Sequence, residues 1–142
     1  MTDFEKYVGI PFRDHGRDAG GCDCWGLVRL VYREQFGIEL SDIGPLYRDT
    51  RDIGGMVQVY YDQAPKWDEV KAPGAGDVVL LNVMNAPVHV GVVIAPGLML
   101  HVERGLDAVV ERFDGSVWKN RVRGFYRSRS LNLKSLGIGR PI

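Results

Sequence analysis

The sequence predicts an α+β fold in which helices come first and an antiparallel sheet of about five strands follows. Apolar residues recur with the helical period in the first half of the chain and with the strand period after the turn-forming segment 73–76. Elements segregated in this way favour helices packed on one face of an antiparallel sheet. With 142 residues, 45% of them hydrophobic, we expect one domain, 1–142, whose last fifteen residues, 128–142, have a weak pattern and form a tail.

The expected helices lie in the first half of the chain. The clearer one begins at Cys24, because Asp23 can cap it, and ends at Gly37, which can adopt a left-handed C-terminal conformation. Its broad apolar stripe consists of Leu27, Val28, Leu30, Val31 and Phe36. After a long loop, a second helix is expected over 53–63, ended by Pro65.

The expected strands alternate apolar and polar residues. They are 77–83, 88–94, 98–103, 108–113 and 122–127. Asp77, at the start of the first strand, is expected to form the turn before it rather than to act as an acid. We expect Trp67 and Trp118 to serve in aromatic packing.

Charge and hydropathy exclude two broad classes of protein. Eighteen basic residues balance eighteen acidic ones, so the basic excess that nucleic-acid binding needs is missing. The basic run over 119–129 is better explained by a solvated strand than by a polyanion site. The longest apolar run is far shorter than the ~18 residues of a membrane span. The amino end lacks the features of an export signal, so we expect synthesis in the cytoplasm without one.

Cys24 is the first candidate for chemistry. A cysteine in the first turn of a helix lies near unpaired N–H groups and the positive dipole end, which are expected to lower the pKa of its thiol. The alternative is an inert, buried cysteine. Cys22 is too close in sequence to form an unstrained bridge with Cys24, and we expect it to be a packed bystander.

Two histidines in the strand region, His89 and His101, can converge on one face of the sheet. The outcome depends on the turn between their strands. A two-residue loop pairs Ala95 with Leu98 and places the imidazoles on opposite faces. An odd-length loop pairs Ile94 with Leu98 and places both on one face as diagonal neighbours.

Together these residues suggest nucleophilic catalysis. Cys24 would be the nucleophile, His89 the base and acid, and His101 the group that orients His89. The backbone N–H of Cys24 could stabilise an oxyanion. A less favoured alternative is a zinc site made of Cys22, Cys24, His89 and His101, although the Cys-x-Cys spacing is tighter than zinc sites normally use.

Five segments, in this order, resemble the NlpC/P60 family of cysteine peptidases. They are 7–12, 20–28, 73–79, 89–92 and 99–102. The similarity covers about 4–127, and its specificity lies in the joint order: an Asp-Cys-x-Gly helix start, a Gly-Asp strand, a His-Val-Gly strand and then His101, twelve positions after His89.

The resemblance implies a papain-like fold and hydrolysis of bacterial cell-wall stem peptides, typically between D-γ-glutamyl and a diamino acid. It assigns Cys24, His89 and His101 as the catalytic triad, and it implies no metal and no other cofactor.

The resemblance also indicates three substrate-binding positions. Asp23 matches a residue that can help to bind the amine end of the substrate. Trp25 and Phe12 lie where the family usually has serine and often has tyrosine, so two hydroxyl groups are missing near the catalytic centre.

The Asp-Cys-Trp-Gly version of the helix start is similar to that of the phage tail-tip subgroup. This implies synthesis in a bacterial cytoplasm, tail-tip proteins as partners, and action from a particle in the host envelope or periplasm. The alternative is a tail assembly or structural protein that keeps the fold with weak or no catalysis.

Overall fold

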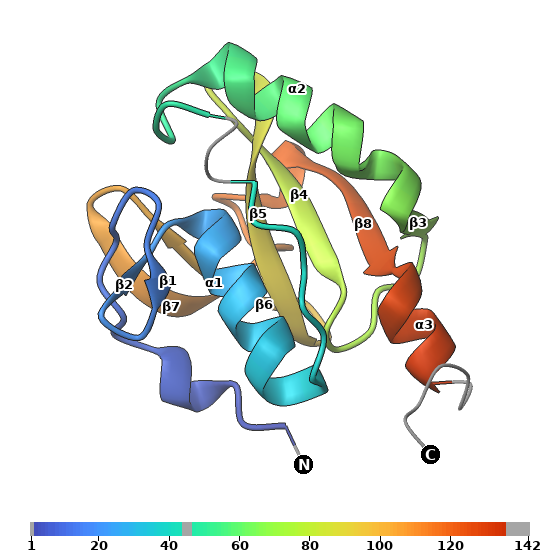
Figure 1. The fold of residues 1–142 in the computed structure, drawn as a ribbon. Coiled ribbons are helices and arrows are strands. Elements are labelled where there is room, and N and C mark those ends of the chain that lie inside the picture. The colour runs from blue at the N-terminus through green and yellow to red at the C-terminus, as the bar shows by residue number, and fades with distance from the viewer. Residues whose placement is uncertain (1, 44–46, 136–142) are drawn as a thin grey trace.

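The computed structural model describes residues 2–43 and 47–135 (Figure 1). Within this part of the chain, six strands form one antiparallel sheet in the order β3-β8-β4-β5-β6-β7, and two short strands form a separate ribbon, β1-β2. Helix α1 packs on β5 and β6, and helix α2 packs across β5. The expected α+β fold, with the cysteine-bearing helix on an antiparallel sheet, is therefore confirmed.

The elements have the following bounds. The large sheet contains β3 (Trp67–Val70), β4 (Val78–Val83), β5 (Ala86–Ala95), β6 (Leu98–Glu103), β7 (Leu106–Arg112) and β8 (Val122–Ser128). The ribbon contains β1 (Arg17–Asp18) and β2 (Gly21–Cys22). The α-helices are α1 (Cys24–Val31), α2 (Ile53–Gln63) and α3 (Arg129–Ser135), and short helical turns are η1 (Glu5–Tyr7), η2 (Tyr32–Phe36), η4 (Ala64–Lys66) and η5 (Lys119–Arg121).

The helical segment made of α1 and η2 begins and ends with the residues that the sequence indicates. The Gly26 N–H donates to Asp23 Oδ1 at 2.8 Å, which satisfies one of the free donors of the first turn. The α-helix proper ends at Val31 and continues as the π-helical turn η2. Gly37 then ends it with φ 66°, a left-handed conformation that glycine adopts without steric cost.

Besides the short strands β1 and β2, which were not expected either, two elements differ from the sequence-based expectation. Strand β3, at the edge of the sheet, was not expected because Asp68 and Glu69 interrupt its apolar alternation. It forms by pairing with β8, and charged residues are typical of edge strands. Helix α3 lies in the tail 128–142, where no regular structure was expected; Leu131 packs on the core. Residues 136–142 of the tail lie outside the described residues.

The turn between β5 and β6 combines features of both loops that we considered. Ala95 pairs with Leu98, so the loop has two residues, and Gly97 has φ 76° after Pro96, the residue pattern of a type II turn. A bulge at Ile94 shifts the register so that Val93 pairs with Met99. The extra residue restores the register of the odd-length loop and places both histidines on one face.

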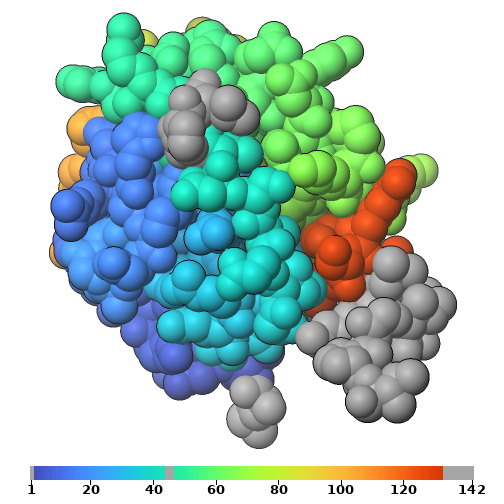
Figure 2. All heavy atoms as spheres, viewed as in Figure 1, coloured from blue at the N-terminus to red at the C-terminus, as the bar shows by residue number. Residues whose placement is uncertain are grey.

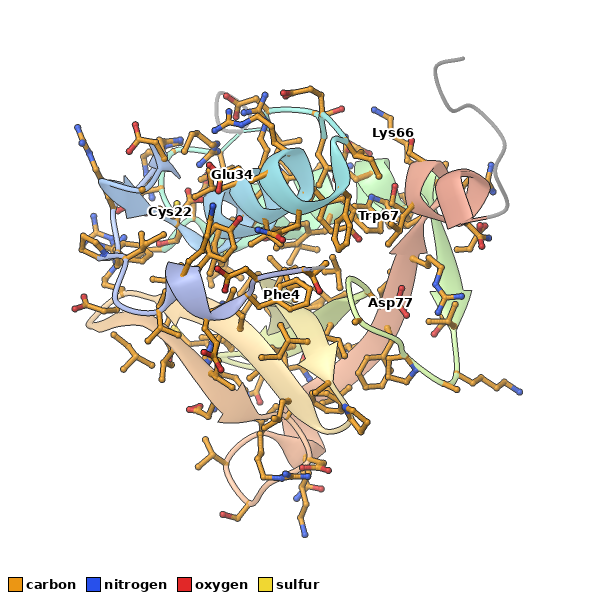
Figure 3. All side chains as sticks on the ribbon, turned by 90° about the horizontal axis from the view of Figure 1, so that it is seen from below. Phe4, Cys22, Glu34, Lys66, Trp67 and Asp77 are labelled. Atoms are coloured by element: carbon orange, nitrogen blue, oxygen red, sulfur yellow. The ribbon has the colours of Figure 1, made fainter. Side chains whose placement is uncertain are left out.

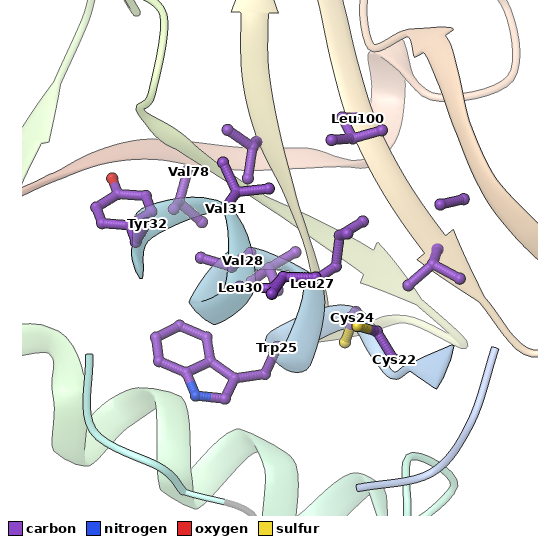
Figure 4. Close-up of a cluster of buried hydrophobic side chains, with 14 of the residues drawn as sticks. Cys22, Cys24, Trp25, Leu27, Val28, Leu30, Val31, Tyr32, Val78 and Leu100 are labelled. Carbon is purple, nitrogen blue, oxygen red and sulfur yellow. The ribbon is translucent and has the colours of Figure 1, made fainter. Parts of the chain in front are cut away.

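The sheet is covered on both faces. On one face, the apolar residues of α1 pack on the strands (Figure 4). On the other face, Trp118 and Phe113 cover a smaller cluster that includes Val93 and Met99. Figure 2 shows the side on which the chain from its N-terminal segment to α2 covers the sheet. None of the helices in the described residues is long and apolar enough to cross a membrane.

Asp77 (labelled in Figure 3) acts as the expected turn residue, and its buried carboxylate also pairs with the partly exposed guanidinium of Arg127. Its carboxylate accepts from the Gly74 N–H at 2.7 Å and from Arg127 Nε and Nη2, each at 2.8 Å. This pair joins the turn before β4 to β8.

Replacing Asp77 with alanine is expected to lower the free energy of unfolding by about 2–3 kcal/mol, because Arg127 and the Gly74 N–H lose their acceptor. Chemical denaturation measures this value. The control is Asp68→Ala, which removes an exposed partner of Arg129 and is expected to cost below about 1 kcal/mol. Equal losses in the two variants would contradict a structural role for the buried pair.

Candidate active site

Cys24 and His89 line one pocket, with a volume of about 440 Å³. Cys24 comes from the first turn of α1, and His89 comes from β5, on which α1 packs. The remaining wall includes charged side chains, Arg51, Glu103 and Arg104. The structure therefore brings the expected nucleophile and the expected base to the same cavity, with groups of both charges around them.

The sulfur of Cys24 lies in a buried environment that disfavours its anion. Burial raises the pKa of the thiol to about 12, and the negative charge of Asp23 adds to this increase. The Tyr60 hydroxyl, 3.6 Å from the sulfur, and the Val90 backbone N–H act in the opposite direction. The direction is the opposite of the lowering expected from the helix start, because desolvation and the capping carboxylate outweigh the hydrogen bonds to the sulfur.

His89 is neutral for the same reason. Burial lowers the pKa of its imidazole to about 3, and the charges of His101 and Arg121 lower it further. The resting site thus holds a neutral thiol and a neutral imidazole, which can accept a proton when the sulfur attacks.

His101 lies directly behind His89, which is one of the two outcomes that the turn between their strands left open. His89 Nε2 and His101 Nδ1 are 2.9 Å apart and form a hydrogen bond between β5 and β6. Gly91 makes room for this arrangement, since a Cβ at this position would lie 3.2 Å from the Cβ of His101. The contact engages Nε2 of His89, so Nδ1 is the nitrogen that remains to accept a proton; among the described residues the polar partners of the Cys24 sulfur are the Tyr60 hydroxyl and the Val90 backbone N–H, and His89 shares only the pocket.

Glu111 and Trp118 complete the surroundings of the histidines. Glu111 Oε1 lies 3.4 Å from His101 Nε2 and accepts a hydrogen bond from Trp118 Nε1. The indole of Trp118 stacks on His89 with ring centroids 5.6 Å apart and an interplanar angle of 24°. Sequence reasoning missed Glu111 because its proximity to His101 depends on the pairing of β6 with β7. Trp118 was expected only to pack.

Asp23 holds the start of α1 within a buried network. Its carboxylate accepts hydrogen bonds from Arg17 Nη1 at 2.9 Å, the His15 N–H at 3.0 Å, the Gly26 N–H and the Tyr47 hydroxyl. Because these four donors occupy both oxygens of a fully buried carboxylate, its role here is structural. Its contact with a substrate amine stays a prediction and would require one donor to be displaced.

The other two predicted binding residues lie on different sides of Cys24. Phe12 lines the pocket of Cys24 and His89, with the Arg104 guanidinium 4.9 Å from its ring centroid. Trp25 points toward α2 instead (Figure 4), and its indole donates to the Ser41 carbonyl at 3.0 Å. It lines a separate apolar cavity of about 240 Å³.

Tyr60 is a site residue that the sequence did not indicate. Its ring lines the apolar cavity, and its hydroxyl reaches the Cys24 sulfur from α2. The only available signal was the aromatic pair 60–61 in the expected second helix, which does not reveal the direction of either ring.

The zinc alternative finds no support in the geometry. The Cys22 thiol donates to the Asp18 carbonyl at 3.1 Å, and burial raises its pKa to about 12. Among the described residues, no three His, Cys, Asp or Glu side chains are grouped so that they could hold a metal ion. Cys22 is packed, as expected.

Comparison with known proteins identifies relatives. The chain is 27% identical over 123 residues to the murein DD-endopeptidase MepS/murein LD-carboxypeptidase of Escherichia coli K12, which covers 85% of this chain and 57% of that protein. It is 30% identical over 96 residues to protein P54 of Enterococcus faecium, which covers 68% of this chain and 16% of that protein. The chain thus spans little more than half of the first relative and a smaller part of the second.

Solved structures share the fold. The NlpC/p60 domain of the peptidoglycan hydrolase SagA aligns with a TM-score of 0.56 and 26% identity over 87% of this chain and 90% of that one. NlpC2 from Trichomonas vaginalis aligns with a TM-score of 0.65 and 16% identity over 87% of this chain and 44% of that one, a likeness of fold. The model of the NlpC/P60 family matches residues 9–127. The chain therefore belongs to the NlpC/P60 family.

Proposed function

We propose that this chain is a cysteine endopeptidase that hydrolyses D-γ-glutamyl–diamino acid bonds in the stem peptides of peptidoglycan. The observation that carries the proposal is the shared pocket of Cys24 and His89, with His101 hydrogen-bonded behind His89. The names of two relatives, a murein endopeptidase and a peptidoglycan hydrolase, support this class of substrate.

The reaction begins from the neutral pair. As the Cys24 sulfur attacks the peptide carbonyl, the thiol proton passes to His89 Nδ1. The backbone N–H of Cys24 donates a hydrogen bond to the negatively charged carbonyl oxygen and stabilises it. His89 then gives the proton to the leaving amine, and a thioester remains. A water molecule attacks the thioester with His89 as base, which releases the carboxylic acid and restores the thiol.

The charges around the pocket fit the proposed bond. A D-γ-glutamyl residue carries a free carboxylate beside the scissile bond, and the exposed guanidinium of Arg51 lies on the pocket wall. Glu103, on the same wall, provides a carboxyl group for the amine of a diamino acid. We propose that this pair of opposite charges orients the stem peptide across Cys24.

The first test uses defined muropeptides and mass spectrometry. The protein is expected to produce a new fragment cleaved at the D-γ-glutamyl bond, and Cys24→Ala is expected to produce none, because it lacks the nucleophile. Cleavage at another bond would overturn the proposed specificity. No cleavage of any stem would overturn the peptidase.

Arg51→Ala is expected to raise KM about two- to fivefold with little change in kcat, because an ion pair with an exposed guanidinium is screened by solvent and contributes modestly. The matched control is Arg112→Ala. Arg51 pairs with Asp49 at 3.0 Å, and Arg112 likewise pairs with an aspartate two residues away, Asp114, at 2.8 Å, but Arg112 lies outside the pocket lining. Equal effects in the two variants would contradict carboxylate recognition by Arg51.

The raised pKa of Cys24 predicts how the thiol reacts with iodoacetamide. With a thiol pKa of about 12 and an imidazole pKa of about 3, both groups are neutral between these values, and the thiolate fraction rises with pH. The alkylation rate, corrected with Cys24→Ala for reaction at Cys22, is expected to increase up to at least about pH 10. A plateau between about pH 6 and 8 would instead reveal a preformed thiolate–imidazolium pair.

We further propose that the protein acts at a phage or prophage tail tip and reaches the host envelope with the particle. The similarity of residues 23–26 to the tail-tip subgroup supports this. Immunolabelled particles are expected to carry the protein at the tail tip, and particles with Cys24→Ala are expected to assemble but deliver DNA poorly. Normal DNA delivery by the Cys24→Ala particles would favour the structural alternative. Particles that do not contain the protein would overturn the tail role.

A further inference from the structure

The nitrogen His101 Nε2 is a buried polar atom without a hydrogen bond of good geometry among the described residues. Its nearest polar partner is the carboxylate of Glu111, 3.4 Å away. Buried nitrogen atoms are normally satisfied, so an unsatisfied one at a reactive site requires an explanation. Hydrogen bonds of catalytic groups are often long before substrate binds and then shorten.

The position of each proton in the histidine pair follows from the chemistry required of Cys24. To accept the thiol proton, His89 must have a bare Nδ1, so its own proton lies on Nε2. That proton is donated to His101 Nδ1, 2.9 Å away. His101 Nδ1 is then the acceptor, which leaves the proton of His101 on Nε2, facing Glu111. The opposite arrangement would put a proton on His89 Nδ1, where it would block the reaction.

We propose that Glu111 is a positioning residue that selects this arrangement, because its carboxylate accepts the Nε2 proton of His101. The proposal deepens the function proposed above and rests on it for the roles of Cys24 and His89. When His89 takes the thiol proton, the same carboxylate also stabilises the positive charge that spreads over the two imidazoles.

Trp118 holds Glu111 in place for this role. Its indole N–H donates to Glu111 Oε1, the same atom that faces His101 Nε2. The ring is fixed in turn by stacking on His89 and by the Arg121 guanidinium, 4.2 Å from its centroid. One side chain thus covers the face of His89 and prevents the carboxylate from turning into solvent.

The strand register explains why Glu111 reaches His101. Met99 pairs with Glu111 and His101 pairs with Val109, so His101 and Glu111 are diagonal neighbours on one face of the sheet. Arg51 and Arg104 lie on the wall of the pocket of His89, and the other charged groups near the histidines are Glu103 and Arg121. No hydrogen bond joins either of them to His101 within the described part of the chain, and Arg121 donates to the Asn82 carbonyl instead.

The test that does not depend on substrate is nitrogen NMR of the histidine side chains in the wild-type protein at pH 7. His89 and His101 are both expected to carry their proton on Nε2. A proton on His101 Nδ1 would overturn the proposal. In Glu111→Ala, the pair is expected to lose this single arrangement. Unchanged proton positions in this variant would also overturn the role of Glu111.

Kinetics on the muropeptide give the second readout. Glu111→Ala is expected to lower kcat at least about tenfold, since a general base contributes about 10²–10⁴. KM should change less than about twofold, because Glu111 does not line the pocket. Glu111→Gln, whose amide oxygen can still accept, should recover part of kcat. A higher KM with unchanged kcat would contradict a positioning role.

The control for stability is Glu69→Ala, which removes an exposed glutamate from β3, the opposite edge of the sheet, and should leave kcat unchanged. If Glu111→Ala does not fold, Glu111→Gln and the wild-type NMR result decide the proposal. The peptidase and the positioning role of Glu111 can fail separately. If no stem is cleaved but both histidines carry their proton on Nε2, the peptidase fails and the role of Glu111 is still supported. If a stem is cleaved but His101 carries its proton on Nδ1, only the peptidase is supported.

Discussion

The buried carboxylate of Asp23 is the contact on which the geometry of the site depends. It caps α1, pairs with Arg17 and holds the backbone of His15, so it joins the first ribbon of the chain to the helix that carries the nucleophile. Its charge also lies next to the Cys24 sulfur and raises the pKa of the thiol. Burial, with the charge of Asp23 added to it, thus keeps the thiol protonated, and in the proposed reaction His89 removes this proton during attack.

The pairing of β5 with β6 fixes the position of His89, the proposed base. His89 and His101 lie on neighbouring strands and share a face because a bulge at Ile94 compensates for the two-residue turn. On that face the apolar cluster and Trp118 exclude water, which keeps both imidazoles neutral. Burial strengthens the hydrogen bond between the two histidines, because the surroundings are of low polarity. The same burial disfavours the thiolate form of Cys24.

Short sequence patterns predicted the helix ends and the strands whose formation depends on residues that are adjacent in the chain. Asp23 and Gly37 mark the ends of the first helical segment, and the period of 2 locates five of the six strands of the large sheet in the described residues. Contacts between distant segments were beyond such signals. Strand β3 forms only because it pairs with β8, and Glu111 lies near His101 because of the register between β6 and β7. The pKa of Cys24 depends on burial, which no short segment of sequence reveals.

Gly91 shows how a residue without functional groups can constrain the evolution of this site. The space beside its backbone is filled by the Cβ of His101, the Leu100 carbonyl and the Met99 sulfur. A Cβ at this position would lie 3.2–3.3 Å from these atoms, so β6 would have to shift slightly against β5, and the spacing of the two imidazoles would shift with it. A survey of natural variants or a mutational scan would therefore show Gly91 to be as intolerant as a residue that takes part in the reaction. Substitutions at Gly91 would be harmful because they alter the spacing between β5 and β6, although Gly91 itself takes no part in the proposed chemistry.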